Sequence, residues 1–243
     1  MKITEENTIG EVVAKDYKLA SLFESYKIDF CCGGGKKINE ICAAKKINTQ
    51  ELVDKINDQL TDQEKDTNNY AAWPLDLLAD YIEKKHHRYV REQIPVLQKF
   101  LNKLSKVHGA NHPELLTINT LFEGAATELT NHMIKEELIL FPYVRQLADN
   151  QESKRDLPEF KSLASPISVM IEEHETEGAR FRRIAELTDN YTPPADACNT
   201  YKAAYVLLQE FEKDLHLHIH LENNILFPKS LKKEKNVEHI STN

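Results

Sequence analysis

The sequence contains few of the residues that interrupt helices, since only 7 of its 243 residues are glycine and 9 are proline. Long stretches instead mix Leu, Glu, Lys and Ala, which have high helix propensity, so we expect an all-α protein. An excess of positive charge is also absent. The formal net charge of −8 argues against a sequence-independent nucleic-acid-binding protein, which needs a basic face.

Cysteines and long apolar runs are equally scarce. The 4 cysteines, two of them adjacent at Cys31 and Cys32, do not form the framework of a secreted disulfide-rich domain. No apolar run approaches the roughly 20 residues of a membrane span. The polar, acidic first residues do not resemble a signal peptide. We therefore expect a cytoplasmic protein with neither a membrane nor a nucleic acid as its partner.

The most informative feature that is present is a repeated segment of eleven residues. Residues 132–142, HMIKEELILFP (copy one), recur as residues 218–228, HIHLENNILFP (copy two). Each copy begins with His-x-x-x-Glu, which a helix places one turn apart on a single face. Two further histidines precede the copies at similar spacing, His87 lying 45 residues before His132 and His174 lying 44 residues before His218. The chain thus has two similar halves.

The distribution of polar segments predicts the domain organisation. Residues 1–60 are expected to form a small helical domain, in which the turn Phe-Cys-Cys-Gly-Gly-Gly-Lys at 30–36 needs unusual backbone angles or a close approach to another group. Residues 61–70 are uniformly polar, and residues 61–72 are expected to form a linker. Residues 73–230 are expected to form an up-down bundle of four helices, with breaks at 107–113, 150–158 and 189–194. Residues 231–243 are expected to form a frayed tail.

The apolar stripes of the expected helices indicate which polar side chains face the core. Apolar residues recur at alternating steps of four and three, and the inward set includes Ile139 and Tyr143. The stripes also contain all but one of the candidate ligands: His132, Glu136, His174, His218 and Glu222. By the same periodicity His216 and His220 face away and are expected to be solvated. In the first helix only one of His86 and His87 is expected to point inward, and the spacing of the halves favours His87.

A buried carboxylate requires a cation or a proton, and the stripes that carry Glu136 and Glu222 contain no Lys or Arg. A single core histidine is more often a hydrogen-bonded structural residue than a ligand. Two buried His-x-x-x-Glu pairs, each with a further histidine in phase, instead favour a metal centre. Imidazole and carboxylate ligands without thiolates suit iron or manganese and tolerate zinc. Glu136 and Glu222 would each bridge two metal ions.

These motifs resemble a known family. Residues 75–230 resemble a hemerythrin-like domain, and the whole chain resembles the iron–sulfur cluster repair di-iron proteins (RIC family, ScdA/YtfE type). The residues that carry the resemblance are the DFCCGGG sequence at 29–35, His87 with REQIP at 91–95, EHE at 173–175 and the two repeat copies. The resemblance implies two iron ions in an oxo-bridged centre and selects His87 over His86. The implied terminal ligands are His87, His132, His174 and His218, and the implied bridging ligands are Glu136 and Glu222.

The function implied by the resemblance is repair of iron–sulfur clusters damaged by oxidative or nitrosative stress, by iron donated from a labile centre. The partners would be damaged or apo iron–sulfur proteins or a cluster scaffold, with NO and O₂ as small ligands. Cys31 and Cys32 would act as a thiol relay, and Glu128, Glu173 and Glu177 are candidates for orienting the imidazoles. Reduction of NO to N₂O and an O₂- or NO-binding sensor are the alternatives, so whether the protein is an enzyme stays open. The oligomeric state also stays open, with a homodimer among the options.

Overall fold

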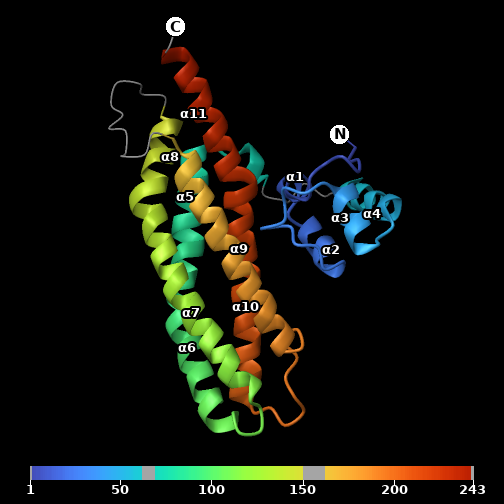
Figure 1. Ribbon diagram of the computed structural model, residues 1–243, viewed down its shortest axis with the longest axis vertical. Coiled ribbons are helices and arrows are strands. Elements are labelled where there is room, and N and C mark those ends of the chain that lie inside the picture. The colour runs from blue at the N-terminus through green and yellow to red at the C-terminus, as the bar shows by residue number, and fades with distance from the viewer. Residues whose placement is uncertain (1, 62–68, 150–161, 242–243) are drawn as a thin grey trace. The chain divides into compact units, whose positions relative to one another are not determined.

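The computed structural model describes residues 2–61, 69–149 and 162–241, and the regular elements in these ranges are helices (Figure 1). The prediction of an all-α protein is therefore confirmed. The α-helices are α1 (Ile9–Lys15), α2 (Leu19–Ser25), α3 (Ile38–Lys45), α4 (Thr49–Thr61), α5 (Leu75–Tyr81), α6 (Arg88–His108), α7 (Glu114–Lys135), α8 (Phe141–Ala148), α9 (Ala164–Leu187), α10 (Asn199–Leu221) and α11 (Phe227–Ser241). The chain forms two compact units, Ala79–His218 and Met1–Leu78 with Ile219–Asn243. The boundary near residue 218 lies inside one continuous helical stretch, since α10 passes directly into Glu222–Leu226 and α11.

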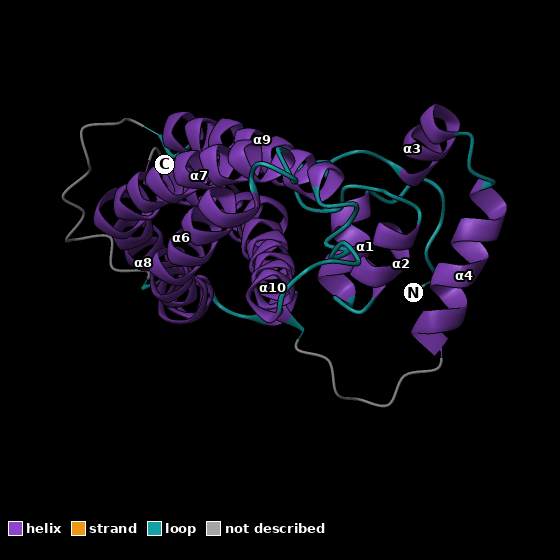
Figure 2. Ribbon diagram, turned by 90° about the horizontal axis from the view of Figure 1, so that it is seen from below, coloured by secondary structure: helices purple, strands orange, loops and turns teal. Residues whose placement is uncertain are grey.

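The unit Ala79–His218 is a four-helix bundle. Figure 2 looks along the bundle and shows α6, α7, α9 and α10 around a common centre. Aromatic rings from three of these helices meet in the core, where the ring centroids of Phe122 and Phe181 each lie 5.5 Å from that of Phe211. The predicted breaks near 107–113 and 189–194 fall between helices. The third predicted break, at 150–158, lies outside the described residues.

In the described part of the chain, three π-helical turns interrupt the long helices, at Ile82–His87, Glu136–Leu140 and Glu222–Leu226. The last two occupy the same positions in the two repeat copies, ahead of Pro142 and Pro228. A proline has no N–H to donate, and its ring clashes with the carbonyl four residues earlier. In both copies the amide of the preceding Phe bonds to the carbonyl of the Glu five residues back, and the widened turn accommodates the proline. Helical hydrogen bonding therefore continues past both prolines.

The extra residue in a π-turn shifts the phase of the apolar stripe. Ile139, predicted to face the core, is 48% exposed, and Leu140 is buried in its place. The α-helix that follows is in register with the core again, because Phe141 and Val144 are fully buried. The periodicity of the sequence is thus interrupted over one turn and then resumes.

The other unit contains α1 to α4 together with the segment from residue 219 onward. Thr8 and Glu11 form a capping box at the start of α1. Helix α1 packs against the π-turn Glu222–Leu226 and against the short 3₁₀ turn Tyr70–Ala72. The prediction of a frayed tail from residue 231 differs from the structure, in which α11 continues to Ser241, consistent with the helix-forming Lys and Glu residues there. Most of the predicted linker 61–72 lies outside the described residues.

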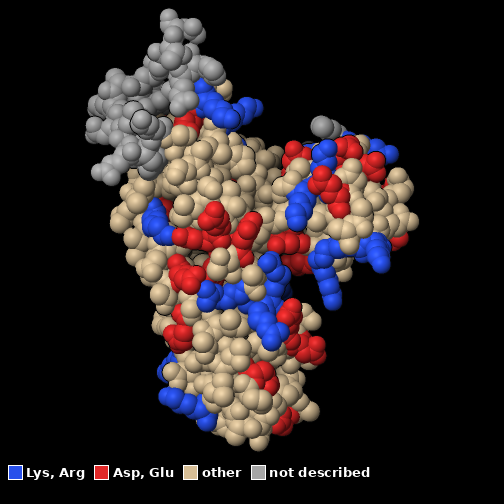
Figure 3. All heavy atoms as spheres, in the orientation of Figure 1, with Lys and Arg blue, Asp and Glu red and all other residues tan. Residues whose placement is uncertain are grey.

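The surface of the described part of the chain carries both signs of charge. On the face shown in Figure 3, Lys and Arg side chains lie among Asp and Glu side chains rather than in one basic patch. Among the described residues, no helix combines the length and the apolar character needed to span a bilayer.

Candidate metal centre

Two pairs of buried imidazoles face each other inside the bundle. The Nε2 atoms of His87 and His218 are 3.2 Å apart, and those of His132 and His174 are 3.0 Å apart. Each pair joins two helical stretches, since His87 lies at the end of the π-turn before α6, His218 in α10, His132 in α7 and His174 in α9. The four histidines predicted from the sequence are therefore brought together as two pairs.

The Glu136 carboxylate lies between the two pairs. Its Oε2 atom is 3.3 Å from Nε2 of His87 and 3.3 Å from Nε2 of His132, and the side chain is fully buried. Glu222 begins the π-turn that continues α10, one turn after His218. Two groups of four buried side chains each have their ligand atoms within 4.8 Å of one another. The first group is His87, Glu136, His218 and Glu222, and the second is His132, Glu136, His174 and Glu222. Both groups contain both glutamates, which is the arrangement that two bridging carboxylates require.

Carboxylates outside the cluster hold two of the imidazoles in one tautomer. His87 Nδ1 lies 2.7 Å from Glu137 Oε1, and His132 Nδ1 lies 2.8 Å from Glu173 Oε2. A carboxylate accepts hydrogen bonds, so Nδ1 carries the proton and Nε2 presents a lone pair to the cluster. Lone pairs so directed, beside a buried carboxylate, repel one another unless a cation lies between them. The donor set therefore fits a pair of metal ions, and carboxylate–imidazole–metal chains are common at such sites.

The same hydrogen bonds lower the pKa values of the supporting carboxylates. The His132 imidazole, with the Lys135 ammonium, lowers the pKa of Glu173 to about 2. Burial would raise the pKa of Glu137, but hydrogen bonds from Arg91 and His87 outweigh it and lower the pKa. Both carboxylates are thus ionised at neutral pH and accept the imidazole protons.

The prediction that only one of His86 and His87 points inward is wrong, because both are fully buried. The two residues end the π-turn Ile82–His87, whose wider turn departs from the spacing assumed for an α-helix. The two imidazoles nevertheless have different neighbours. His86 stacks on the ring of His218 at 5.6 Å between centroids, and its Nδ1 lies 3.0 Å from Asp214 Oδ2. Of the two residues, His87 is the one whose Nε2 atom points toward His218 Nε2 and Glu136 Oε2.

The prediction that His220 is solvated is also wrong. Its side chain is 1% exposed, and its ring lies 5.9 Å from that of Phe30 and 6.0 Å from that of Tyr17. The periodicity correctly predicted that His220 points away from the ligand face, but residues of the N-terminal domain, which belong to the same unit, cover its side chain. Burial lowers the pKa of His220 to about 4. His216 is half-buried and lies 3.9 Å from Glu212.

The three glutamates predicted to orient imidazoles have different positions. Glu173 contacts His132 directly, as described above. Arg180 pairs with both of the others, at 2.9 Å from Glu128 and 3.1 Å from Glu177. Burial raises the pKa of Glu177 to about 7, an effect that Arg180 partly opposes. All three glutamates line a cavity of about 260 Å³ that is also lined by His132 and His174, so this half of the cluster borders open space.

Sequence reasoning missed two carboxylates that contact buried imidazoles, Glu137 and Asp214. Asp214 lies one helical turn before His218, so the apolar stripe of α10 could have placed it on the inner face. Glu137 directly follows a candidate ligand and lies outside the stripe. Its partner His87 comes from another helix, and no spacing in the sequence connects the two residues.

The predicted thiol pair lies in the unit that contains the N-terminal domain. Cys31 is buried and Cys32 half-buried, and their Sγ atoms are 3.8 Å apart. Hydrogen bonding with Cys32, together with burial, raises the pKa of the Cys31 thiol well above its ordinary value. At neutral pH this thiol is therefore protonated.

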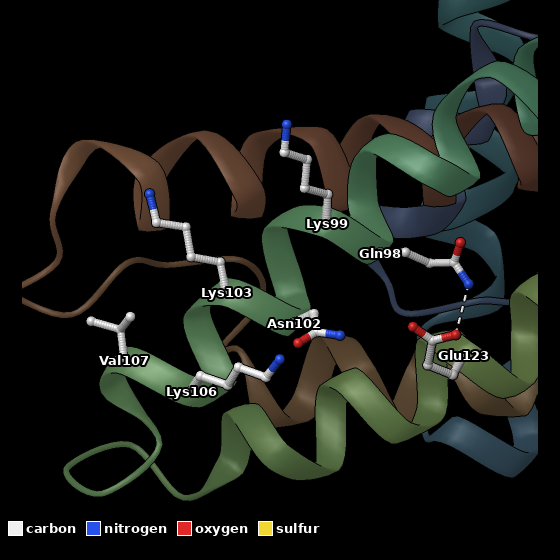
Figure 4. A pocket seen from close by; sticks show the side chains of 7 residues that line it. All are labelled: Gln98, Lys99, Asn102, Lys103, Lys106, Val107 and Glu123. Carbon is white, nitrogen blue, oxygen red and sulfur yellow. Dashed lines mark hydrogen bonds between the residues drawn. The ribbon is translucent and has the colours of Figure 1, made fainter.

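A larger hollow of about 630 Å³ lies on the surface of α6 and contains none of the candidate ligands (Figure 4). Gln98 donates a 2.6 Å hydrogen bond to Glu123 of α7 at one end of the hollow. Lys99 and Lys103 extend away from this pair (Figure 4). The hollow is thus lined by ammonium groups and by none of the residue groups that could hold a metal ion.

Comparisons with known proteins agree with this geometry. The model of the hemerythrin HHE cation binding domain matches residues 78–230, and the ScdA_N model, described as a domain of unknown function, matches residues 5–60. The iron–sulfur cluster repair protein ScdA of Staphylococcus haemolyticus is 33% identical over 93% of this chain and 99% of its own length. The iron–sulfur cluster repair protein YtfE is 34% identical in Musicola paradisiaca, over 94% of this chain and 98% of that protein. In Yersinia pseudotuberculosis YtfE is 35% identical, over 93% of this chain and 97% of that protein.

Proposed function

We propose that this chain, which belongs to the hemerythrin-like family of ScdA and YtfE iron–sulfur cluster repair proteins, restores iron–sulfur clusters that oxidative or nitrosative stress has damaged. The observation that carries the proposal is the pair of facing imidazole pairs with the Glu136 carboxylate between them. The clients would be damaged or apo iron–sulfur proteins or a cluster scaffold. The function would be performed by two domains, residues 1–60 and 73–230.

The proposed ligand set assigns each buried side chain one role. His87 and His218 would hold one iron ion, and His132 and His174 would hold the other. Glu136 and Glu222 would bridge the two ions, which an oxo group would also join. Bound in this way, the iron would supply both the redox chemistry of the centre and the metal delivered to the client. NO and O₂ are the small ligands that such a centre would meet.

The surrounding residues prepare this site without touching the metal. Glu137 and Glu173 keep the proton at Nδ1 of His87 and His132, so that each Nε2 atom can donate its lone pair. The cavity beside His132 and His174 supports release of an ion from this half of the cluster. Cys31 and Cys32 would relay that ion.

The first experiment is metal analysis with Mössbauer spectroscopy on protein from iron-replete cells, alongside Glu136→Ala and Glu222→Ala. Two coupled irons per chain are expected in the wild type, and loss or uncoupling of the irons is expected in both variants. Glu128→Ala is the control, because Glu128 contacts Arg180 and no candidate ligand. Zinc, or a single iron in the wild type, would contradict the proposed centre.

Transfer of iron is tested separately with protein loaded with ⁵⁷Fe and a purified iron–sulfur enzyme inactivated by NO or peroxide. The label is expected to appear in the client as its activity returns. A full centre with no reactivation would refute the repair function while leaving the ligand set intact. Multiple turnovers of NO to N₂O would support the NO-reductase alternative, and neither that activity nor a sensor function is named for the relatives.

A further inference from the structure

We propose that Asp29, Cys31 and Cys32 form a second metal site that binds one divalent ion of borderline softness, such as ferrous iron or zinc. The three side chains lie in the turn between α2 and α3, and each offers one ligand atom within 4.8 Å of the other two. Two thiolates and a carboxylate differ in chemistry from the imidazole–carboxylate cluster of the bundle. The site therefore needs its own account.

The distances between the ligand atoms match a small tetrahedral ion. With a metal–sulfur bond of about 2.3 Å, two sulfur ligands at the tetrahedral angle lie about 3.8 Å apart. The Sγ atoms of Cys31 and Cys32 are 3.8 Å apart. With a metal–oxygen bond of about 2.0–2.2 Å, a sulfur and an oxygen ligand lie roughly 3.5–3.6 Å apart. Cys31 Sγ and Asp29 Oδ1 are 3.3 Å apart, so a small rotation about the side-chain bonds would complete the geometry.

The turn is built so that these three side chains converge. The backbone amides of Cys31 and Cys32 both donate to Asp29 Oδ1, at 3.1 and 3.0 Å. This pair of bonds fixes the carboxylate beside the thiols. It also explains why an acidic residue stands two positions before the first cysteine, since Asp accepts hydrogen bonds from the backbone just after it.

Copy two of the repeat holds the turn from its other side. Asn224 Nδ2 donates to the carbonyl oxygens of Phe30 and Cys31, at 3.3 and 3.2 Å. A Cβ atom at Gly34 would lie 2.6 Å from the carbonyl oxygen of Phe30 as well as 2.4 Å from Asn224 Oδ1, so only glycine fits there. Gly34 is therefore explained by close approach, one of the two reasons expected from the sequence for this turn. The thiols are fixed to the helical segment that carries Glu222.

The chemistry of the three side chains suits a divalent cation. A thiol binds a metal ion as the thiolate, so each thiol would release its proton when the ion binds, and the three ligands would then carry three negative charges. Cys32 is half-buried, so the ion could enter from its side. Three protein ligands leave a fourth position open, as in sites that exchange ligands.

The role of the site rests on the proposed function, whereas its existence does not. An open three-ligand site would hold an iron ion between the bundle and a client, and it gives the proposed thiol relay a defined chemistry. Binding requires no change of oxidation state. The metal displaces the two thiol protons, which pass to solvent, and the ion leaves when client ligands replace the thiolates.

The test uses Co²⁺ as the probe, with the full chain kept under anaerobic, reducing conditions. Thiolate-to-cobalt charge transfer gives an absorption band that imidazoles and carboxylates cannot produce. The band is expected in the wild type, with one equivalent of Co²⁺ responsible for it, and it should be lost in Cys31→Ser and in Cys32→Ser. Cys198→Ser is the matched control, because that exposed cysteine lies in the bundle unit.

A third variant separates ligation from folding. Asp29→Asn keeps an oxygen that accepts the two amide hydrogen bonds but removes the charge. Its Co²⁺ affinity is expected to fall about tenfold or more, with the helical content unchanged by circular dichroism. A charge-transfer band that survives in both cysteine variants would overturn the site. So would its absence from the wild type when mass spectrometry finds both thiols free.

The role of this site in passing iron to the client, its transit role, is measured separately. In Cys31→Ser the two irons of the bundle should remain by Mössbauer spectroscopy, while delivery of ⁵⁷Fe to the client slows at least severalfold. Unchanged delivery would overturn the transit role. If the wild type itself fails to reactivate the client, the repair function fails, and the cobalt band still decides whether the second site exists.

Discussion

Copy one and copy two of the repeat are alike on their inner faces and differ on their outer faces. In both, His and Glu one turn apart enter the candidate centre, and a π-turn precedes Phe-Pro. On the outer side, copy one has Ile134 and Leu138, which are 44% and 73% exposed. The equivalent positions of copy two are His220 and Asn224, and both contact residues of the N-terminal domain. The inner faces of both copies thus carry candidate ligands, and the outer face of copy two packs against the N-terminal domain.

A second difference concerns the residue that follows each glutamate. Copy one has Glu137, which supports His87 from outside the cluster, whereas copy two has Asn223 at the equivalent position. Copy one therefore supplies candidate ligands of its own and also the carboxylate that contacts His87, a ligand from another helical segment. The comparison indicates that the candidate centre is symmetric in its ligands and asymmetric in what surrounds them.

The largest expected effect tests the feature that both copies share, the π-turn. Deletion of Leu138 would remove the extra residue and rotate the following helix by about 100° relative to the core. Three fully buried residues, Phe141, Val144 and Leu147, would then turn outward. Each contributes about 1.5–3 kcal/mol of burial, so we expect a loss of more than about 4 kcal/mol in the free energy of unfolding, measured in urea.

The control is Leu138→Ala, which keeps the length of the turn. Because Leu138 is exposed, the substitution is expected to change the free energy of unfolding by no more than about 0.5 kcal/mol. A deletion variant as stable as the wild type would mean that the π-turn has no role in the register of α8.

This turn also marks the limit of what the sequence predicts. The helical bundle and the convergence of His132, His174 and His218 follow from regular apolar stripes, which local spacing determines. The exposure of Ile139 and the burial of both His86 and His87 occur in π-turns, which the regular spacing of an α-helix does not predict. The burial of His220 depends on Tyr17 and Phe30, about 200 residues away, and no local pattern can predict it.

A smaller effect is expected from the supports of the imidazoles, where the copies differ in their surroundings. Glu173→Gln and Glu137→Gln should each weaken iron binding about 10- to 100-fold, because an amide cannot fix the Nδ1 proton as a carboxylate does. The readout is the rate of iron loss to a chelator together with the affinity from competition. Glu186→Gln is the matched control, since Glu186 pairs with Arg183 and does not line the cavity beside the cluster. Equal affinities in all three variants would show that the supports do not tune the site.

The smallest expected effect comes from exchanging the outer residues of the two copies. Asn224→Leu introduces the residue of copy one and removes the hydrogen bonds to the carbonyls of Phe30 and Cys31, at a cost of about 1–2 kcal/mol. The reciprocal change, Leu138→Asn, alters an exposed side chain and should cost less than about 0.5 kcal/mol. Urea unfolding of both variants measures the difference, and hydrogen exchange at residues 30–36 locates it. If the two changes cost the same, Asn224 does not hold the cysteine turn. If only Asn224→Leu destabilises the protein and increases exchange in that turn, the outer face of copy two is a docking surface for the N-terminal domain.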